Sequence, residues 1–184
     1  MISIFKRKSR EKLDNNRINV TIFSREKIEE LLKQGSLQNN LAVISFYDNP
    51  MIVDDPYCVP VNYPNNIPVF FSQTDDIAYE FLAVRGYSEE TYFQDDVEMA
   101  KFILSCVNKG IKNFYCQCEF GQSRSSAVAA AITEFYNKDG IEIFSNHQFS
   151  PNKIIYRKLF NALKMQNFLI AINFWINRLG LFYI

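Results

Sequence analysis

Cys118 and Arg124, with five residues between them, are the two side chains best placed to carry out chemistry together. Gly121 lies in the middle of the run that separates them. The preceding segment, residues 111–116, is apolar and strand-like, and the following segment, residues 125–136, is alanine-rich and helix-like. Backbone N–H groups at a helix N-terminus point into the preceding loop, where the helix dipole favours negative charge. The pattern therefore predicts an anion cradle.

The chemistry predicted for this cradle is nucleophilic attack on a phosphoryl group. The positive end of the helix dipole favours the thiolate of Cys118, which is the nucleophilic form. Arg124 offers a planar fork of donors that suits phosphate. Ser125 can place a hydroxyl near the sulfur and assist its departure as a leaving group. The phosphate oxygens would be held by Arg124 and by backbone N–H groups of Glu119, Phe120, Gly121, Gln122 and Ser123.

Residues Cys118–Ser125 resemble the C-x5-R-[S/T] signature of the cysteine-dependent protein tyrosine and dual-specificity phosphatases. Gly121 and Ser125 follow the dual-specificity version of that signature. Three further segments resemble landmarks of small bacterial and phage-type members, namely Tyr47–Pro50, Phe70–Ile77 and Ser150–Tyr156. The resemblance extends over residues 18–164.

This resemblance implies a fold, an activity and a general acid. The fold is a three-layer α/β domain with a central, parallel-rich sheet flanked by helices. The activity is hydrolysis of a phosphate monoester through a cysteinyl-phosphate, with no metal or organic cofactor. The family places an aspartate on a movable loop to protonate the leaving group and then activate water. The best match is Asp76, with Asp75 second, whereas Asp95 and Asp96 are better interpreted as acids at a helix N-terminus.

The departure from the family pattern is Gln117, which stands where the family usually has a histidine that favours the thiolate. Glutamine keeps hydrogen-bonding capacity but carries no charge. A catalytically weak phosphate-binding module therefore remains an alternative. A rhodanese-like sulfurtransferase or an arsenate reductase would also use a loop cysteine, but the strand–loop–helix order and Arg124-Ser125 disfavour both.

Hydrophobic periodicity predicts alternating strands and helices, which is typical of a layered α/β domain. The predicted strands are 18–23, 41–47, 69–72 and 111–116, and the predicted helices are 25–34, 93–108, 125–137, 141–144 and 152–165. Residues 56–68 carry several prolines and are expected to form a loop. Residues 77–87 are ambiguous between a lid-like insertion and a short helix.

The composition is that of a single domain with a sizeable, aromatic-rich core. The chain has 184 residues, of which 48% are hydrophobic, and its formal net charge is zero, so no global field attracts nucleic acid or a membrane. The four cysteines are expected to be reduced. A zinc site is rejected because His147 is the sole histidine. The predicted partner is a phosphorylated protein or another phosphate monoester, without obligatory nucleic acid.

The two ends of the chain differ from its centre. Residues 1–17 are polar, residues 18–165 form the predicted domain, and residues 166–184 are apolar and predicted to pack on it as a helix or tail. Membrane contact and self-association are the alternatives for this last segment. The sequence shows no secretion signal, and a cytoplasmic protein is expected.

Four more residues are candidates for supporting roles. Asn152 and Tyr156 belong to the last family-like segment and are expected to support the cradle or to pack beneath it. Tyr57 and Tyr63 lie in the proline-rich loop, where loop packing is favoured over stacking on an aryl phosphate. Phosphotyrosine, phosphoserine or phosphothreonine, RNA 5′ phosphates and phosphoinositides all fit the predicted cradle.

Overall fold

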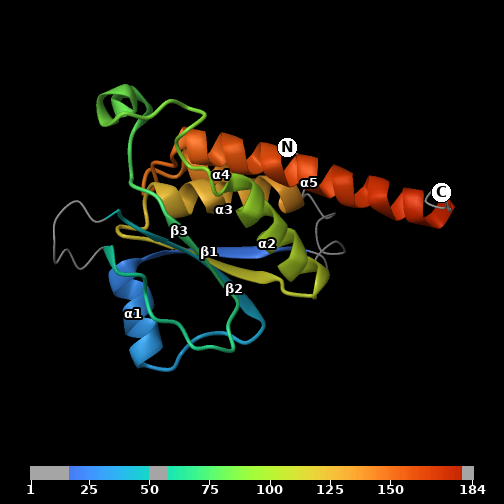
Figure 1. Ribbon diagram of the computed structural model, residues 1–184. Coiled ribbons are helices and arrows are strands. Elements are labelled where there is room, and N and C mark those ends of the chain that lie inside the picture. The colour runs from blue at the N-terminus through green and yellow to red at the C-terminus, as the bar shows by residue number, and fades with distance from the viewer. Residues whose placement is uncertain (1–16, 50–57, 180–184) are drawn as a thin grey trace, which may run out of the picture.

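The computed structural model describes residues 17–49 and 58–179 (Figure 1). Three ranges lie outside this description, residues 1–16, 50–57 and 180–184. These ranges contain most of the predicted polar N-terminal segment, Tyr57 and the end of the predicted apolar tail.

A four-stranded parallel sheet forms the centre of the molecule. Its strands are β1 (Asn19–Ser24), β2 (Leu41–Tyr47), β3 (Val69–Gln73) and β4 (Asn113–Cys118), in the spatial order β1-β4-β2-β3. Each neighbouring pair is parallel, and Cys118 is paired with Ser24 at the end of the β1–β4 ladder. The predicted parallel-rich sheet is confirmed. The last strand begins two residues later than predicted and continues to Cys118 itself.

Helices cover both faces of the sheet and make three layers, as predicted. Helix α1 (Arg25–Lys33) lies on one face, and the other face is covered by α2 (Asp96–Asn108), α3 (Arg124–Asn137), α4 (Ile141–Ser145) and α5 (Lys153–Leu179) (Figure 1). Successive strand residues point to opposite faces. Phe114, Cys116 and Cys118 therefore join the core under α3, while Tyr115 joins a smaller core with Ile28 of α1.

The ambiguous segment 77–87 is an insertion of two short 3₁₀ turns, η3 (Tyr79–Phe81) and η4 (Ala83–Arg85). It stands out from the body of the molecule (Figure 1). Leu82 is buried and fixes the segment to the core, whereas Phe81 and Val84 are exposed. The segment therefore combines features of both predicted alternatives, because it projects from the domain and contains short helical turns.

Helix α5 continues without a break through the boundary predicted at residue 165. Its first half buries Ile155, Leu159 and Leu163 against α2 and α3. Beyond Lys164 the helix projects past those two helices (Figure 1), and its large apolar side chains are exposed. In the described part of residues 166–184 these side chains do not pack on the domain as predicted, because no described element lies alongside them. Among the described residues, no helix is both long enough and apolar enough to cross a bilayer.

Two leucines on α5 test this division of the helix. Leu163 is fully buried, so Leu163→Ala should lower the free energy of unfolding by about 3 kcal/mol. Leu169 is exposed, and Leu169→Ala should change it by no more than about 0.5 kcal/mol. Urea denaturation of both variants measures the difference. A loss at Leu169 as large as that at Leu163 would show that the distal half of α5 packs on the domain.

Candidate active site

The carboxyl ends of the parallel strands meet at one edge of the sheet, where open α/β sheets bind their ligands. Cys118 is the last residue of β4. Asp48 directly follows β2, and Thr74–Asp76 directly follow β3. Arg124 opens α3 beside them. The fold thus brings together the thiol, the arginine and three carboxylates from separate parts of the sequence.

The loop between β4 and α3 turns its carbonyl groups outward. The carbonyl oxygen of Glu119 accepts from the N–H of Arg25 at 3.0 Å, that of Gln122 from Ser150 at 2.9 Å, and that of Ser123 from Asn152 at 3.3 Å. Within the described chain, the N–H groups of residues 119–124 donate to no acceptor. Unpaired N–H groups at a helix N-terminus form a binding site for an anion.

Cys118 lies at the base of this loop and is almost fully buried. Its Sγ is 3.0 Å from Oγ of Ser125, so the hydroxyl can donate to a thiolate. The next hydroxyl, that of Ser126, donates to the carbonyl of Ser123 at 2.9 Å and fixes the entry into α3. Cys116 is fully buried, and burial raises the pKa of its thiol, so it remains protonated.

Arg124 is a buried cation with 2% of its surface exposed. Its Nη1 donates to a carboxylate oxygen of Asp48 and, at 2.7 Å, to the carbonyl of Thr74. Its Nε lies 3.9 Å from Oδ2 of Asp76 and donates to no acceptor among the described residues. Burial lowers the pKa of the guanidinium, but the negative charges of Asp48, Cys118 and Asp76 outweigh burial and leave the pKa above its ordinary value.

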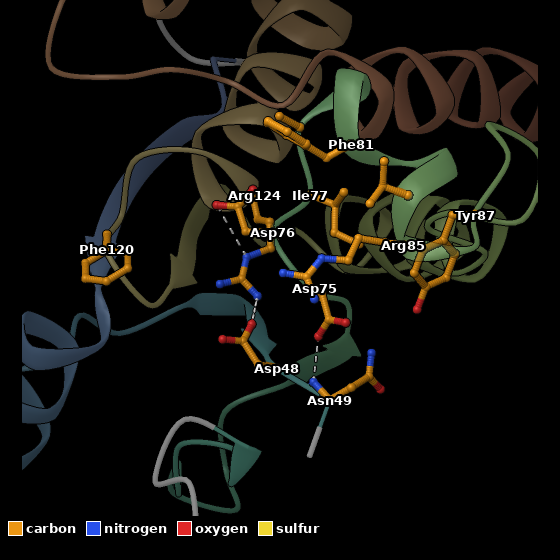
Figure 2. Close-up of a pocket in the computed structure, with 12 residues that line it drawn as sticks. Asp48, Asn49, Asp75, Asp76, Ile77, Phe81, Arg85, Tyr87, Phe120 and Arg124 are labelled. Carbon is orange, nitrogen blue, oxygen red and sulfur yellow. Dashed lines mark hydrogen bonds and ion pairs between the residues drawn. The ribbon is translucent and has the colours of Figure 1, made fainter. Parts of the chain in front are cut away.

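The two neighbouring candidate acids point in different directions (Figure 2). Asp76 turns toward the loop, where its Oδ1 accepts from Oγ of Ser123 at 2.7 Å. Asp75 turns away, and its Oδ1 accepts from the N–H of Asn49 at 2.8 Å. Of the two, Asp76 alone makes contacts with loop residues, Ser123 and Arg124.

Tyr92 and Asn152 hold the backbone on either side of Asp76. The hydroxyl of Tyr92 donates to the carbonyl of Asp75 at 2.9 Å, and the amide of Asn152 donates to the carbonyl of Ile77 at 3.0 Å. That amide also donates to the Tyr92 hydroxyl at 3.2 Å. Burial raises the pKa of Tyr92 to about 12, so its hydroxyl stays protonated and able to donate. Asn152 therefore supports both the cradle and the segment that carries Asp76.

Gln117 points to the opposite face of the sheet from Cys118, because adjacent strand residues alternate. It is fully buried, and its Oε1 accepts from Oγ of Ser45 on β2 at 2.6 Å. Its Nε2 has no partner among the described residues. The side chain thus links β4 to β2 on the face of the sheet opposite to the thiol.

The remaining candidates lie away from the loop. Asp95 caps the start of α2 and accepts from Oγ of Ser72 at 2.7 Å, and Asp96 lies in the first turn of α2. Tyr63 is buried in the smaller core, which agrees with loop packing. His147 follows α4. Within the described residues, no three acidic, cysteine or histidine side chains cluster as metal ligands would.

Sequence reasoning missed the roles of two residues, Asp48 and Tyr92. Asp48 directly follows a buried strand of the predicted parallel sheet, and this position indicates a place at the ligand-binding edge of the sheet. The sequence does not indicate a role for Tyr92, because its hydroxyl contacts the Asp75 carbonyl only once the insertion between them has folded.

A cavity of about 940 Å³ opens beside the loop (Figure 2). One wall carries Asp48, Asp76 and Arg124, and the insertion contributes Phe81 and Val84 to another. Arg85 extends toward the cavity from the same insertion (Figure 2). Phe120, with 73% of its surface exposed, stands at the rim. The cavity is therefore charged near the thiol, and farther out apolar side chains surround the cation Arg85.

Solved structures show which fold this is. DUSP15 superposes with a TM-score of 0.53 at 15% identity, over 85% of this chain and 93% of DUSP15. This is the fold of the cysteine-dependent tyrosine and dual-specificity phosphatases. A human tyrosine phosphatase-like serine/threonine/tyrosine-interacting protein gives a TM-score of 0.48 at 16% identity, over 80% of this chain and 93% of that protein. No family model and no curated sequence matches the chain.

The resemblance seen in Cys118–Ser125 is thus confirmed for the phosphatase fold. In this fold the loop after β4 must pass close to β1, and Gly121 permits that approach. Its φ is +69°, and a Cβ there would lie 2.7 Å from the backbone nitrogen of Ser24. The same Cβ would lie 2.9 Å from the carbonyl carbon of Phe23. Both neighbouring atoms belong to the backbone, so the contact cannot be relieved without moving the loop.

Gly121→Ala should therefore destabilise the phosphatase fold by about 2 kcal/mol or more and distort the cradle. The matched control is Gly35→Ala, which has a similar φ of +63° but open space around its Cβ. The control should cost about 1 kcal/mol, from its backbone conformation alone. Thermal unfolding of both variants measures the difference, and equal losses would show that the close approach to Ser24 carries no cost.

Proposed function

We propose that this chain hydrolyses phosphate monoesters through a cysteinyl-phosphate intermediate, as a protein tyrosine or dual-specificity phosphatase. The observation that supports this most is the set of unpaired donors around Cys118. The N–H groups of residues 119–124 and Nε of Arg124 have no acceptor within the described chain. Of these donors, Nε of Arg124 is buried, and a buried donor without a partner is costly. The oxygens of a phosphoryl group above the sulfur would satisfy these donors.

In the first step, the Cys118 thiolate attacks phosphorus and the bond from phosphorus to the leaving oxygen breaks. Asp76, in its acid form, gives its proton to that oxygen. The product leaves as an alcohol or phenol, and the phosphoryl group is bound to Sγ. Arg124 and the loop N–H groups stabilise the charge on the three equatorial oxygens. Asp48 keeps the Arg124 guanidinium in place during the step.

In the second step, the Asp76 carboxylate takes a proton from a water molecule, whose oxygen attacks phosphorus. The S–P bond breaks, and the thiolate leaves with the support of the Ser125 hydroxyl at 3.0 Å. Inorganic phosphate is released, and Asp76 is again protonated. The step needs no metal or organic cofactor.

The decisive experiment compares the wild type with Cys118→Ser and Arg124→Lys on an aryl phosphate. Cys118→Ser should lower kcat by about 10³-fold or more, because the nucleophile is lost. Arg124→Lys should lower it by about 10²-fold, because lysine lacks the planar fork. Acid-quenched mass spectrometry of the wild type should detect a phosphoryl adduct on Cys118.

Two other outcomes would contradict the proposal. A wild type that binds phosphopeptides without turnover would be a phosphate-binding module. Transfer of sulfur from thiosulfate, with no turnover of the aryl phosphate, would indicate a sulfurtransferase.

A second experiment assigns the general acid with a matched pair of neighbours. Asp76→Asn should slow hydrolysis of phenyl phosphate by about 10²-fold, because its phenolate must be protonated as it leaves. The loss should be smaller on p-nitrophenyl phosphate, whose leaving group is stable without a proton. Asp75→Asn keeps an acceptor for the Asn49 N–H and should lower the rate by about threefold at most. The reverse order of effects would make Asp75 the acid.

A further inference from the structure

The distal half of α5, residues 165–179, forms an exposed apolar surface that we call the α5 extension. Three of its aromatic side chains are largely exposed, Phe168 at 63%, Phe174 at 60% and Trp175 at 57%. No described element covers them, and the extension projects from the domain (Figure 1). An exposed apolar surface of this kind marks a site of interaction.

The extension carries an apolar stripe along one side, although the exposed Ile170 and Phe174 lie outside it. Met165, Phe168, Ile172 and Trp175 follow one another at spacings of three and four residues, and therefore lie along one side of the helix. Gln166 and Asn173 lie seven residues apart along another side. The polar side chains between the two ends of the extension are uncharged amides.

Both charges at the ends of the extension are positive. Lys164 precedes it and lies 5.3 Å from the ring centroid of Phe160, and Arg178 lies 5.9 Å from that of Trp175. The sequence contains no aspartate or glutamate after Glu142. A partner that carries negative charge would therefore be complementary to this surface.

Pairing with the α5 extension of a second copy does not supply that negative charge. In an antiparallel pair centred on Ala171, Lys164 of one copy would lie beside Arg178 of the other, with no carboxylate to offset the repulsion. A parallel pair would place each cation beside its own equivalent. The apolar stripe also spans only about two heptads, and stable coiled coils sustain the pattern over at least three.

We propose that the α5 extension docks on an anionic phospholipid surface and lies along it rather than crossing it. Phe168 and Trp175 would enter the boundary between headgroups and acyl chains, where aromatic side chains are favoured. Lys164 and Arg178 would pair with anionic headgroups. The helix is not apolar enough to span a bilayer, which agrees with an interfacial position.

The chain carries its own reporter for this interaction, because Trp175 is its sole tryptophan. The full chain is titrated with vesicles of phosphatidylcholine and with vesicles that also contain phosphatidylserine. Tryptophan emission should shift to the blue, and the protein should co-sediment, with the phosphatidylserine vesicles. High salt should weaken the binding, since the charge contribution is screened. Absence of both signals, or equal binding to neutral vesicles, would overturn the proposal.

Variants separate the contributions of charge and apolar contact. Lys164→Gln and Arg178→Gln should each weaken vesicle binding by about fivefold, the effect of one cation near an anionic surface. Phe168→Asn should weaken it by about tenfold or more. The control is Val59→Asn, which replaces an equally exposed apolar residue outside α5 and should leave binding unchanged.

Turnover of a soluble aryl phosphate is measured for every variant. It should match the wild type for the α5 variants, because no residue of α5 lines the cavity beside Cys118, so the lipid proposal can fail or hold independently of the proposed function. Sedimentation velocity tests the alternative that a second copy of the chain binds the extension. A dimer that Phe168→Asn converts to monomer, without vesicle binding by the wild type, would show that the extension pairs with a second copy.

Discussion

The candidate site depends on how the charge of Arg124 is held inside the protein. An ion removed from water without a partner costs several kcal/mol, so a buried guanidinium needs acceptors from the surrounding structure. Asp48 comes from the end of β2, and the Thr74 carbonyl and Asp76 come from the end of β3. The order of the parallel sheet is what brings these strand ends to the first turn of α3. The strand order of the sheet therefore determines where the guanidinium can be held.

The same arrangement sets the electrostatic conditions for any bound phosphate. A phosphoryl group would meet the donors of the loop and of Arg124, but also the carboxylates of Asp48 and Asp76. The balance is favourable only where one of these carboxyl groups is protonated, as a general acid must be, or where the anion displaces a carboxylate from Arg124. Among the described side chains, Asp48 is held by the guanidinium alone, whereas Asp76 is also held by Ser123. The two carboxylates therefore differ in how firmly their side chains are held.

The sequence predicted those features that local pattern determines. Apolar runs and helical spacing gave the four strands and the main helices, and the spacing from Cys118 to Arg124 gave the loop. Contacts that depend on the path of the chain in space could not be predicted. Nothing local distinguishes Asp75 from Asp76, because their orientations depend on Asn49 and Ser123. The apolar pattern beyond Lys164 predicted burial, yet among the described elements α5 packs on α2 and α3 and extends beyond both.

Helix α5 also fixes a distance. It starts next to Asn152, whose N–H binds the loop carbonyl of Ser123, and its 27 residues extend for about 40 Å to Leu179. No proline or glycine interrupts it. The helix therefore sets the distance between the thiol and whatever its far end contacts. Adding one residue within it would lengthen that spacing by about 1.5 Å and turn the far end by about 100° relative to the loop.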